Sequence, residues 1–239
     1  MKIRVQNYTP EGFIALDNSA LIYPPTEAVY NANTFRVSLD LCYTIKQEIL
    51  EQALHDVLER CSYAKVSLHA GFFWYYLSPN TKQPLVHPEG SYPSGRFSFK
   101  ENNGYLFKVL YSEHRIALEC FHALTDGSGA MAYLKLLVER YCHYANIADF
   151  QFPGALNYKA RPSIQEFSDP FQHLYDKNLP SYPKISKAYH RKGTGSIDDR
   201  VKVISASIPT KQIKERAKAR GITIGEYLSS TYLYALQQL

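Results

Sequence analysis

The sequence FHALTDGSG, residues 121–129, joins a predicted strand to a predicted helix. Residues 115–122 form the last of several short strand-like segments in the first half of the chain. From about Gly129 to His143, apolar side chains recur at three- and four-residue spacing, which is typical of the buried face of a helix. The pattern therefore places His122 at the exit of a strand, directly before the loop that opens a helix.

A second strand and helix are predicted upstream. Apolar residues alternate through Phe35–Leu41, which is the period of a half-buried strand. One apolar stripe at three- and four-residue spacing then predicts an amphipathic helix over Ile45–Cys61. Thr44 stands at the N-cap position, with Gln47 in the third helical place of a capping box.

The segment between these two units is predicted to be rich in strands. Phe72–Leu77 is mostly aromatic, which favours a half-buried strand over a platform for stacking nucleic-acid bases. No nucleic-acid-binding signature accompanies it, so we expect no nucleic-acid partner. Strands at Arg96–Lys100 and Tyr105–Tyr111 flank Asn103-Gly104, the strongest short hairpin signal, and a turn at Ser112–His114 follows.

The last third of the chain has a different character. Residues 144–200 contain eight prolines and glycines and show little periodicity, which favours a crossover segment. A strand at Val201–Ile208 and a basic helix at Lys211–Arg220 follow, and Gly221 ends that helix. Thr223 and Glu226 then form a second capping box, which opens a helix to the end of the chain.

These patterns predict a domain organisation. The strand, threonine and helix of the first unit recur in outline after the crossover, with Thr210 in the place of Thr44. We therefore expect an N-terminal domain at residues 1–150, a crossover at 151–200, and the start of an incomplete second domain at 201–239. We also expect the chain to act with a missing second domain or as a homo-oligomer.

Composition and charge exclude several classes of protein. With 45% hydrophobic residues, the chain can bury a sizeable core. No apolar run approaches the roughly 20 residues that span a bilayer, and the four cysteines form no CxxC pair, so we expect a reduced cytoplasmic protein. Residues 1–175 carry 15 basic and 17 acidic side chains, whereas residues 176–239 carry 12 and 5. This basic excess indicates either a solvated face or an anionic ligand.

His122 is the candidate catalytic residue. An imidazole titrates near neutral pH and acts as a general base when it is held within reach of a substrate. Asp126, four residues on, could orient the ring or anchor the loop through an arginine, and Gly127 could take an unusual backbone angle.

Other readings of the same residues are weaker. A Cys120–His122 dyad is conceivable, although a buried cysteine packing as a small hydrophobe is commoner. Ser128 lacks the flanking glycines of a nucleophile elbow. A metal pair of His122 and Asp126 lacks a third ligand at a recognisable spacing, so we expect no metal.

The sequence His122-Ala-Leu-Thr-Asp126-Gly127 resembles the H-x-x-x-D-G motif of the chloramphenicol-acetyltransferase-like superfamily of CoA-dependent acyltransferases. This superfamily includes alcohol acyltransferases and the condensation domains of nonribosomal peptide synthesis. Condensation domains usually carry a second histidine where this chain has Phe121, which favours the alcohol-acyltransferase branch. The order of elements is also similar to that of the two-domain members over nearly the whole chain.

The resemblance implies an α/β fold, a two-layer sandwich with a mixed, largely antiparallel sheet covered by helices. It also implies that His122 removes the proton from an acceptor hydroxyl or amine, which attacks an acyl-CoA thioester, while Asp126 and Gly127 are structural. Acyl-CoA would be a co-substrate, and no cofactor would be bound permanently. The alternatives are amide or ester formation from a carrier-bound thioester, and a truncated, non-catalytic domain.

Overall fold

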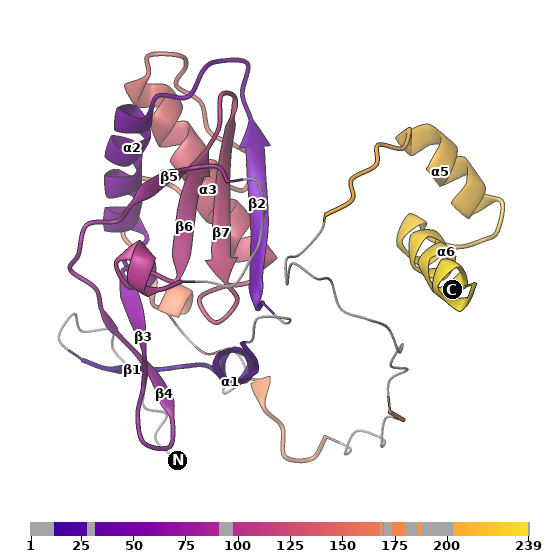
Figure 1. The fold of residues 1–239 in the computed structure, drawn as a ribbon, viewed down its shortest axis with the longest axis horizontal. Helices are drawn as coiled ribbons and strands as arrows, with labels where there is room; N and C mark the ends of the chain where they lie inside the picture. Colours follow the sequence, from indigo (N-terminus) through magenta and orange to yellow (C-terminus); the bar gives the residue numbers. More distant parts are fainter. Residues whose placement is uncertain are drawn as a thin grey trace. The chain divides into compact units, whose positions relative to one another are not determined.

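The computed structural model describes residues 12–27, 32–90, 98–167, 169, 174–179, 186–187 and 203–238. The chain divides into two compact units, Met1–Val201 and Lys202–Leu239. The first unit contains the candidate site, and its larger sheet determines where that site lies (Figure 1).

The larger sheet of the first unit has four strands in the order β2-β7-β6-β5. They are β2 (Thr34–Asp40), β7 (Arg115–Phe121), β6 (Phe107–Tyr111) and β5 (Val86–Pro88). The β2–β7 and β7–β6 pairs are antiparallel, and the β6–β5 pair is parallel. The sheet is therefore mixed and largely antiparallel, as predicted.

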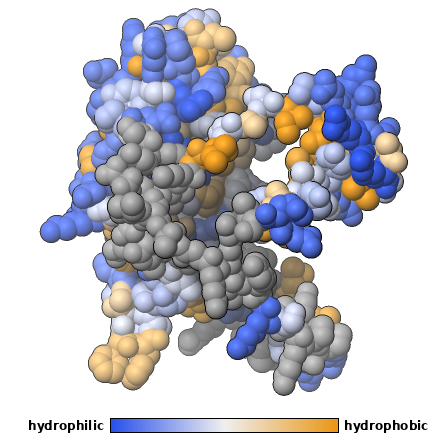
Figure 2. Space-filling view, turned by 45° about the vertical axis from the view of Figure 1, so that its right-hand side comes forward, coloured by the Kyte–Doolittle hydropathy of each residue, from blue (hydrophilic) through white to orange (hydrophobic). Residues whose placement is uncertain are grey.

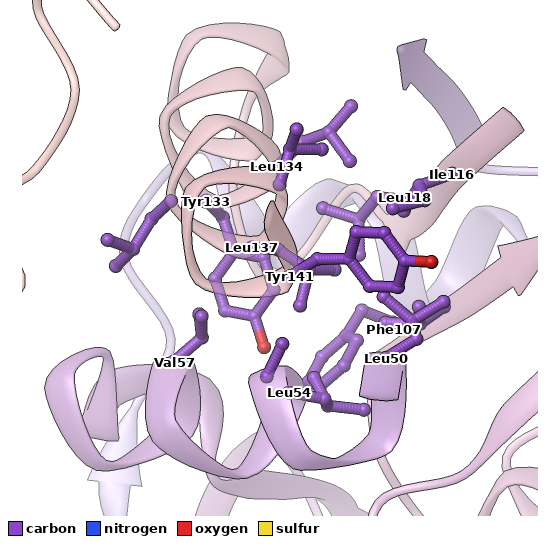
Figure 3. Packing of buried hydrophobic residues seen from close by; sticks show 14 of the residues in the cluster. Leu50, Leu54, Val57, Phe107, Ile116, Leu118, Tyr133, Leu134, Leu137 and Tyr141 are labelled. Carbon is purple, nitrogen blue, oxygen red and sulfur yellow. The ribbon is translucent and has the colours of Figure 1, made fainter. Parts of the chain in front are cut away.

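Helices α2 (Gln47–Arg60) and α3 (Gly127–Tyr144) cover one face of this sheet (Figure 1). Their apolar stripes meet the alternate strand residues that point to the same side, and Figure 3 shows these side chains directed toward one another. Fully buried members of this core include Leu50, Leu54, Val57, Val109, Ile116, Leu134 and Leu137. The predicted α/β sandwich of sheet and helices is confirmed.

A smaller antiparallel sheet lies in the same unit. Its order is β1-β4-β3, with β1 at Ile14–Ala15, β4 at Tyr75–Pro79 and β3 at Val66–Ala70. A short helix, α1 (Tyr23–Thr26), follows β1. Val66 and Leu106 form a second apolar cluster with Phe121, the last residue of β7. The strand that ends at the candidate site is thus fixed by both clusters.

The predicted strand at Phe72–Leu77 is present only from Tyr75, and the predicted strand at Arg96–Lys100 is wrong over its described residues. Residues 72–74 form a turn rather than the start of a strand, and β4 begins only at Tyr75. Lys100–Asn102 forms a 3₁₀ helix, followed by Asn103 and Gly104 at positive φ, so Asn-Gly does not close the predicted hairpin. The reason is local, because the Asn102 side chain donates hydrogen bonds to the carbonyls of Tyr105 and Phe107. Arg96 and Phe97 lie outside the described residues.

The predicted cap of α2 is also wrong. Lys46 rather than Thr44 is the N-cap residue, and its side chain makes no capping hydrogen bond. The Lys46 N–H donates instead to the Tyr141 hydroxyl of α3, at 2.9 Å. Gln47 accepts a hydrogen bond from the Tyr111 hydroxyl at 2.7 Å. The Tyr141 side chain, distant in sequence, therefore satisfies the N–H group of the N-cap residue.

The first part of the crossover packs on the first unit. The Arg60 side chain, at the end of α2, donates to the Asn157 carbonyl at 2.9 Å and pairs with Glu166 at 2.8 Å. Glu166 lies in a 3₁₀ turn, Ile164–Phe167. Arg60 is 6% exposed, so this buried charge is compensated by a partner from the crossover.

The second unit contains α5 (Thr210–Lys218) and α6 (Ile224–Gln237). Gly221 takes a φ of +68° after α5, and the predicted capping box of Thr223 and Glu226 is present. The predicted strand at Val201–Ile208 is wrong over its described part, since residues 203–209 form no ladder and Ile204 is 96% exposed. Of the helices in the ranges described, none is long and apolar enough to cross a membrane.

The α2–α3 core yields a stability prediction. Leu54 is fully buried between the helices and the sheet, so Leu54→Ala leaves a cavity and is expected to lower the free energy of unfolding by about 2–5 kcal/mol. Urea unfolding followed by circular dichroism measures the difference. Gln52→Ala, on the exposed side of the same helix, should change it by less than about 0.5 kcal/mol, and equal losses in both variants would contradict this packing.

Candidate active site

The backbone places His122 directly after β7. Pairing with β2 continues one residue past the strand, because the His122 N–H donates to the Asn33 carbonyl at 2.8 Å. The chain then turns, and the Leu124 N–H donates to the Phe121 carbonyl at 2.9 Å. His122 is thus held by backbone hydrogen bonds at the strand exit, where the sequence predicted it.

Aromatic side chains hold the His122 ring. The Tyr23 ring of α1 stacks on it with 4.5 Å between centroids and 8° between planes. The Phe35 ring of β2 contacts it at 4.8 Å and 56°. Neither ring nitrogen of His122 forms a hydrogen bond with any residue that the structure describes. In a neutral imidazole one ring nitrogen carries the hydrogen and the other a lone pair, so one nitrogen of this half-buried ring is available to accept a proton.

Asp126 is the N-cap residue of α3. Its carboxylate accepts a hydrogen bond from the Gly129 N–H at 2.8 Å, and its backbone is extended. Within the described ranges its side chain forms no ion pair with an arginine and no hydrogen bond with His122. Asp126 therefore satisfies one of the free N–H groups at the start of the helix, where a negative charge is also favoured by the helix dipole.

The two glycines of the motif differ in their surroundings. Gly127 is the first residue of α3, it does not take a positive φ, and a Cβ there would meet nothing within 4 Å. The unusual backbone angle expected of Gly127 is not used in this structure. A Cβ on Gly129 would lie 2.1 Å from Oγ1 of Thr125, so the close approach is at Gly129, which sequence reasoning did not single out.

Burial argues against the Cys120–His122 dyad. Cys120 is 1% exposed, and burial raises the pKa of its thiol, so a reactive thiolate is disfavoured. Among the residues that the structure describes, no three or more His, Cys, Asp or Glu side chains gather in an arrangement that could hold a metal ion.

A small apolar cavity lies behind the motif, between β7 and α3. Its volume is about 10 Å³, and its lining includes Cys120, Thr125, Gly129 and Tyr133. The Tyr133 hydroxyl is buried there, with no hydrogen-bond partner among the described residues, and burial raises its pKa. Such a space fits roughly one water molecule and is too small for an acyl chain.

Comparison with known proteins gives likeness to solved structures only. No protein-family model and no curated protein matches the chain. The starter condensation domain of rhizomide synthetase RzmA is similar at 11% identity, covering 52% of this chain and 35% of that chain, with a TM-score of 0.40. A variant of that domain is similar at 12% identity, covering 70% of this chain and 45% of that chain, with a TM-score of 0.48. The SgcC5 protein from Streptomyces globisporus is similar at 12% identity, covering 58% of this chain and 38% of that chain, with a TM-score of 0.43.

Each of these matched chains is longer than this chain. The region of similarity spans only 35–45% of the length of those chains. Another RzmA variant was solved in complex with C8-CoA, at 13% identity to this chain and a TM-score of 0.44.

The capping role of Asp126 can be tested by stability. Asp126→Ala removes the acceptor of the Gly129 N–H and is expected to lower the free energy of unfolding by about 1 kcal/mol. Asp126→Asn keeps an acceptor of similar capping strength and should stay close to wild type. Chemical denaturation of the three proteins makes the comparison, and an unchanged Asp126→Ala protein would contradict the capping role.

The stacking of Tyr23 on His122 can be tested by chemical modification. Tyr23→Ala uncovers one face of the imidazole and is expected to raise the rate at which diethyl pyrocarbonate modifies His122. Tyr23→Phe keeps the stacked ring and should leave the rate unchanged. Mass spectrometry of the His122 peptide gives the rate, with His114 in the β6–β7 turn as internal reference. A rate that is equal in all three proteins would contradict the stacking.

Proposed function

We propose that this chain contributes the histidine base of an acyltransferase, which moves an acyl group such as acetyl from acyl-CoA to a hydroxyl acceptor. The observation that carries the proposal is the His122 ring at the exit of β7, oriented by Tyr23 and Phe35, with nitrogens that no described residue occupies. The H-x-x-x-D-G sequence around it supports the same class of reaction.

The proposed reaction needs a single base. His122 takes the proton from the acceptor hydroxyl as its oxygen attacks the thioester carbonyl carbon, and a C–O bond forms. The C–S bond then breaks, and the CoA sulfur leaves with the proton that the imidazolium returns. General-base catalysis of this kind contributes roughly 100- to 10,000-fold to the rate.

Asp126 and Gly127 have supporting roles in this proposal. The Asp126 carboxylate caps α3, which fixes the position at which the helix starts behind the histidine. Gly127 begins that helix next to the cap. Neither residue contacts the reacting atoms in the proposed mechanism.

The proposed site extends beyond the first domain. We assign residues 1–150 to an N-terminal domain that carries His122, residues 151–200 to the crossover, and residues 201–239 to the start of a second domain. In the proposal, contacts to acyl-CoA and to the acceptor come in part from residues outside this N-terminal domain.

Loss of His122 tests the proposal. His122→Ala is expected to reduce acyl transfer from acetyl-CoA to a panel of alcohols by roughly 100-fold or more, because the proposed reaction uses this single base. Release of free CoA thiol and formation of ester are measured together. His114→Ala, in the exposed β6–β7 turn, is the matched control and should keep wild-type turnover.

Three results would contradict the proposal. Normal turnover in the His122→Ala variant would show that His122 is not the base. Transfer from an acyl-carrier-protein thioester but not from acyl-CoA would favour the condensation-like reaction, and no transfer from either donor would favour a non-catalytic domain.

A further inference from the structure

The β3–β4 hairpin ends in an exposed aromatic turn. Phe72 is 88% exposed, Phe73 is 84% exposed and Trp74 is 61% exposed. In Figure 1 this turn forms the lower end of the first unit, and Figure 2 shows apolar side chains gathered at that end. We call Phe72, Phe73 and Trp74 the aromatic tip. These three consecutive aromatic side chains belong to neither of the two apolar clusters described above.

The aromatic tip has a defined shape. The Gly71 N–H donates to the Trp74 carbonyl at 2.7 Å, which closes the turn. The Trp74 ring lies over Gly71, where a Cβ would be 3.3 Å from indole atoms. Phe72 and Phe73 contact each other edge to face, with 4.6 Å between centroids. The exposed rings are therefore presented on a closed turn.

The hairpin that carries the tip is free of formal charge. Residues 66–79, VSLHAGFFWYYLSP, contain no Asp, Glu, Lys or Arg, although charged residues make up 21% of the chain. Phe13, beside β1, adds a further ring that is 76% exposed and contacts Tyr76 edge to face at 4.8 Å. An apolar, uncharged projection of this kind is costly in water and favourable in a less polar medium.

We propose that the aromatic tip inserts into the interfacial region of a phospholipid bilayer. Tryptophan and other aromatic side chains favour that region, because their rings are apolar and the indole N–H can still reach a hydrogen-bond partner. The tip is a convex turn, which can enter between lipid head groups without a matching groove. The proposal does not depend on the proposed acyl transfer.

The backbone sets the depth of insertion. Unpaired N–H and C=O groups are excluded from the hydrocarbon region, and β3 and β4 pair with each other from Val66–Pro79 to Ala70–Tyr75. Within the turn, the Gly71 N–H already pairs with the Trp74 carbonyl, but β3 is the edge strand of its sheet, so alternate backbone groups along it point away from β4. The insertion is therefore shallow. Because the hairpin carries no Asp, Glu, Lys or Arg, we expect the insertion to be insensitive to salt.

Trp74 gives a direct measurement, because it is the only tryptophan in the chain. The full 239-residue chain is mixed with neutral phosphatidylcholine vesicles, and the emission of Trp74 is recorded. We expect the emission to shift to shorter wavelength, acrylamide quenching to fall, and brominated lipids to quench most strongly when bromine is near the head groups. The shift should persist at ~1 M salt, where the Debye length is about 3 Å.

A variant that keeps the reporter tests the two phenylalanines. Phe72→Ser with Phe73→Ser retains Trp74 and is expected to lower vesicle partitioning by about tenfold or more. Tyr43→Ser removes an aromatic side chain that is 54% exposed elsewhere on the first unit, and it should partition as wild type does. Circular dichroism checks that each variant is folded. Quenching of Trp74 by brominated lipids in the wild-type protein measures insertion of the aromatic tip independently of the variants.

Three outcomes would overturn the proposal. Vesicle binding without a change in Trp74 emission would place the contact on another surface. Binding to anionic vesicles alone, lost at high salt, would make it electrostatic. Without lipid, the Trp74 emission could already lie at short wavelength, be protected from acrylamide and depend on protein concentration. That result would show that a second copy of the chain covers the aromatic tip.

Discussion

The antiparallel pairing of β2 with β7 is the interaction on which the first unit depends. Seven residue pairs match along it, from Thr34 opposite Phe121 to Asp40 opposite Arg115. Alternation along β7 then directs Ile116, Leu118 and Cys120 toward the helices. A slip of one residue would move these side chains to the other face of the sheet. The same pairing, continued by one hydrogen bond, fixes the backbone of His122.

An ion pair on the other face of the sheet supports this register. Arg36 of β2 stands directly opposite Glu119 of β7, and its side chain donates to that carboxylate at 2.7 and 2.9 Å. Arg36 also pairs with Glu89, just after β5. Glu119 is 7% exposed, so a shifted register would leave a buried carboxylate without its partner. Charge on one face and apolar packing on the other therefore specify the same alignment.

The sequence predicted those features that depend on neighbouring residues. The helix after the motif and the Thr223 capping box follow from spacing within one or two turns, and both are present. The Thr44 cap failed because Tyr141, 95 residues from Lys46, supplies the hydrogen bond instead. The position of His122 was predictable, whereas its contact with Tyr23 was not. That contact joins α1 to the end of β7 across about a hundred residues, and no periodic pattern marks it.

The four-residue spacing of His122 and Asp126 has a physical explanation in this fold. The strand ends at residue 121, a short turn reverses the chain, and the helix needs a cap before its first residue at 127. The residue at 126 must be extended and must offer an oxygen to the third helical N–H, which Asp does well. Its carboxylate is thus engaged by the helix, and ring stacking rather than a carboxylate orients the imidazole. The proposed base and the helix cap thus have separate functions, and their separation in sequence is the length of the turn between the strand and the helix.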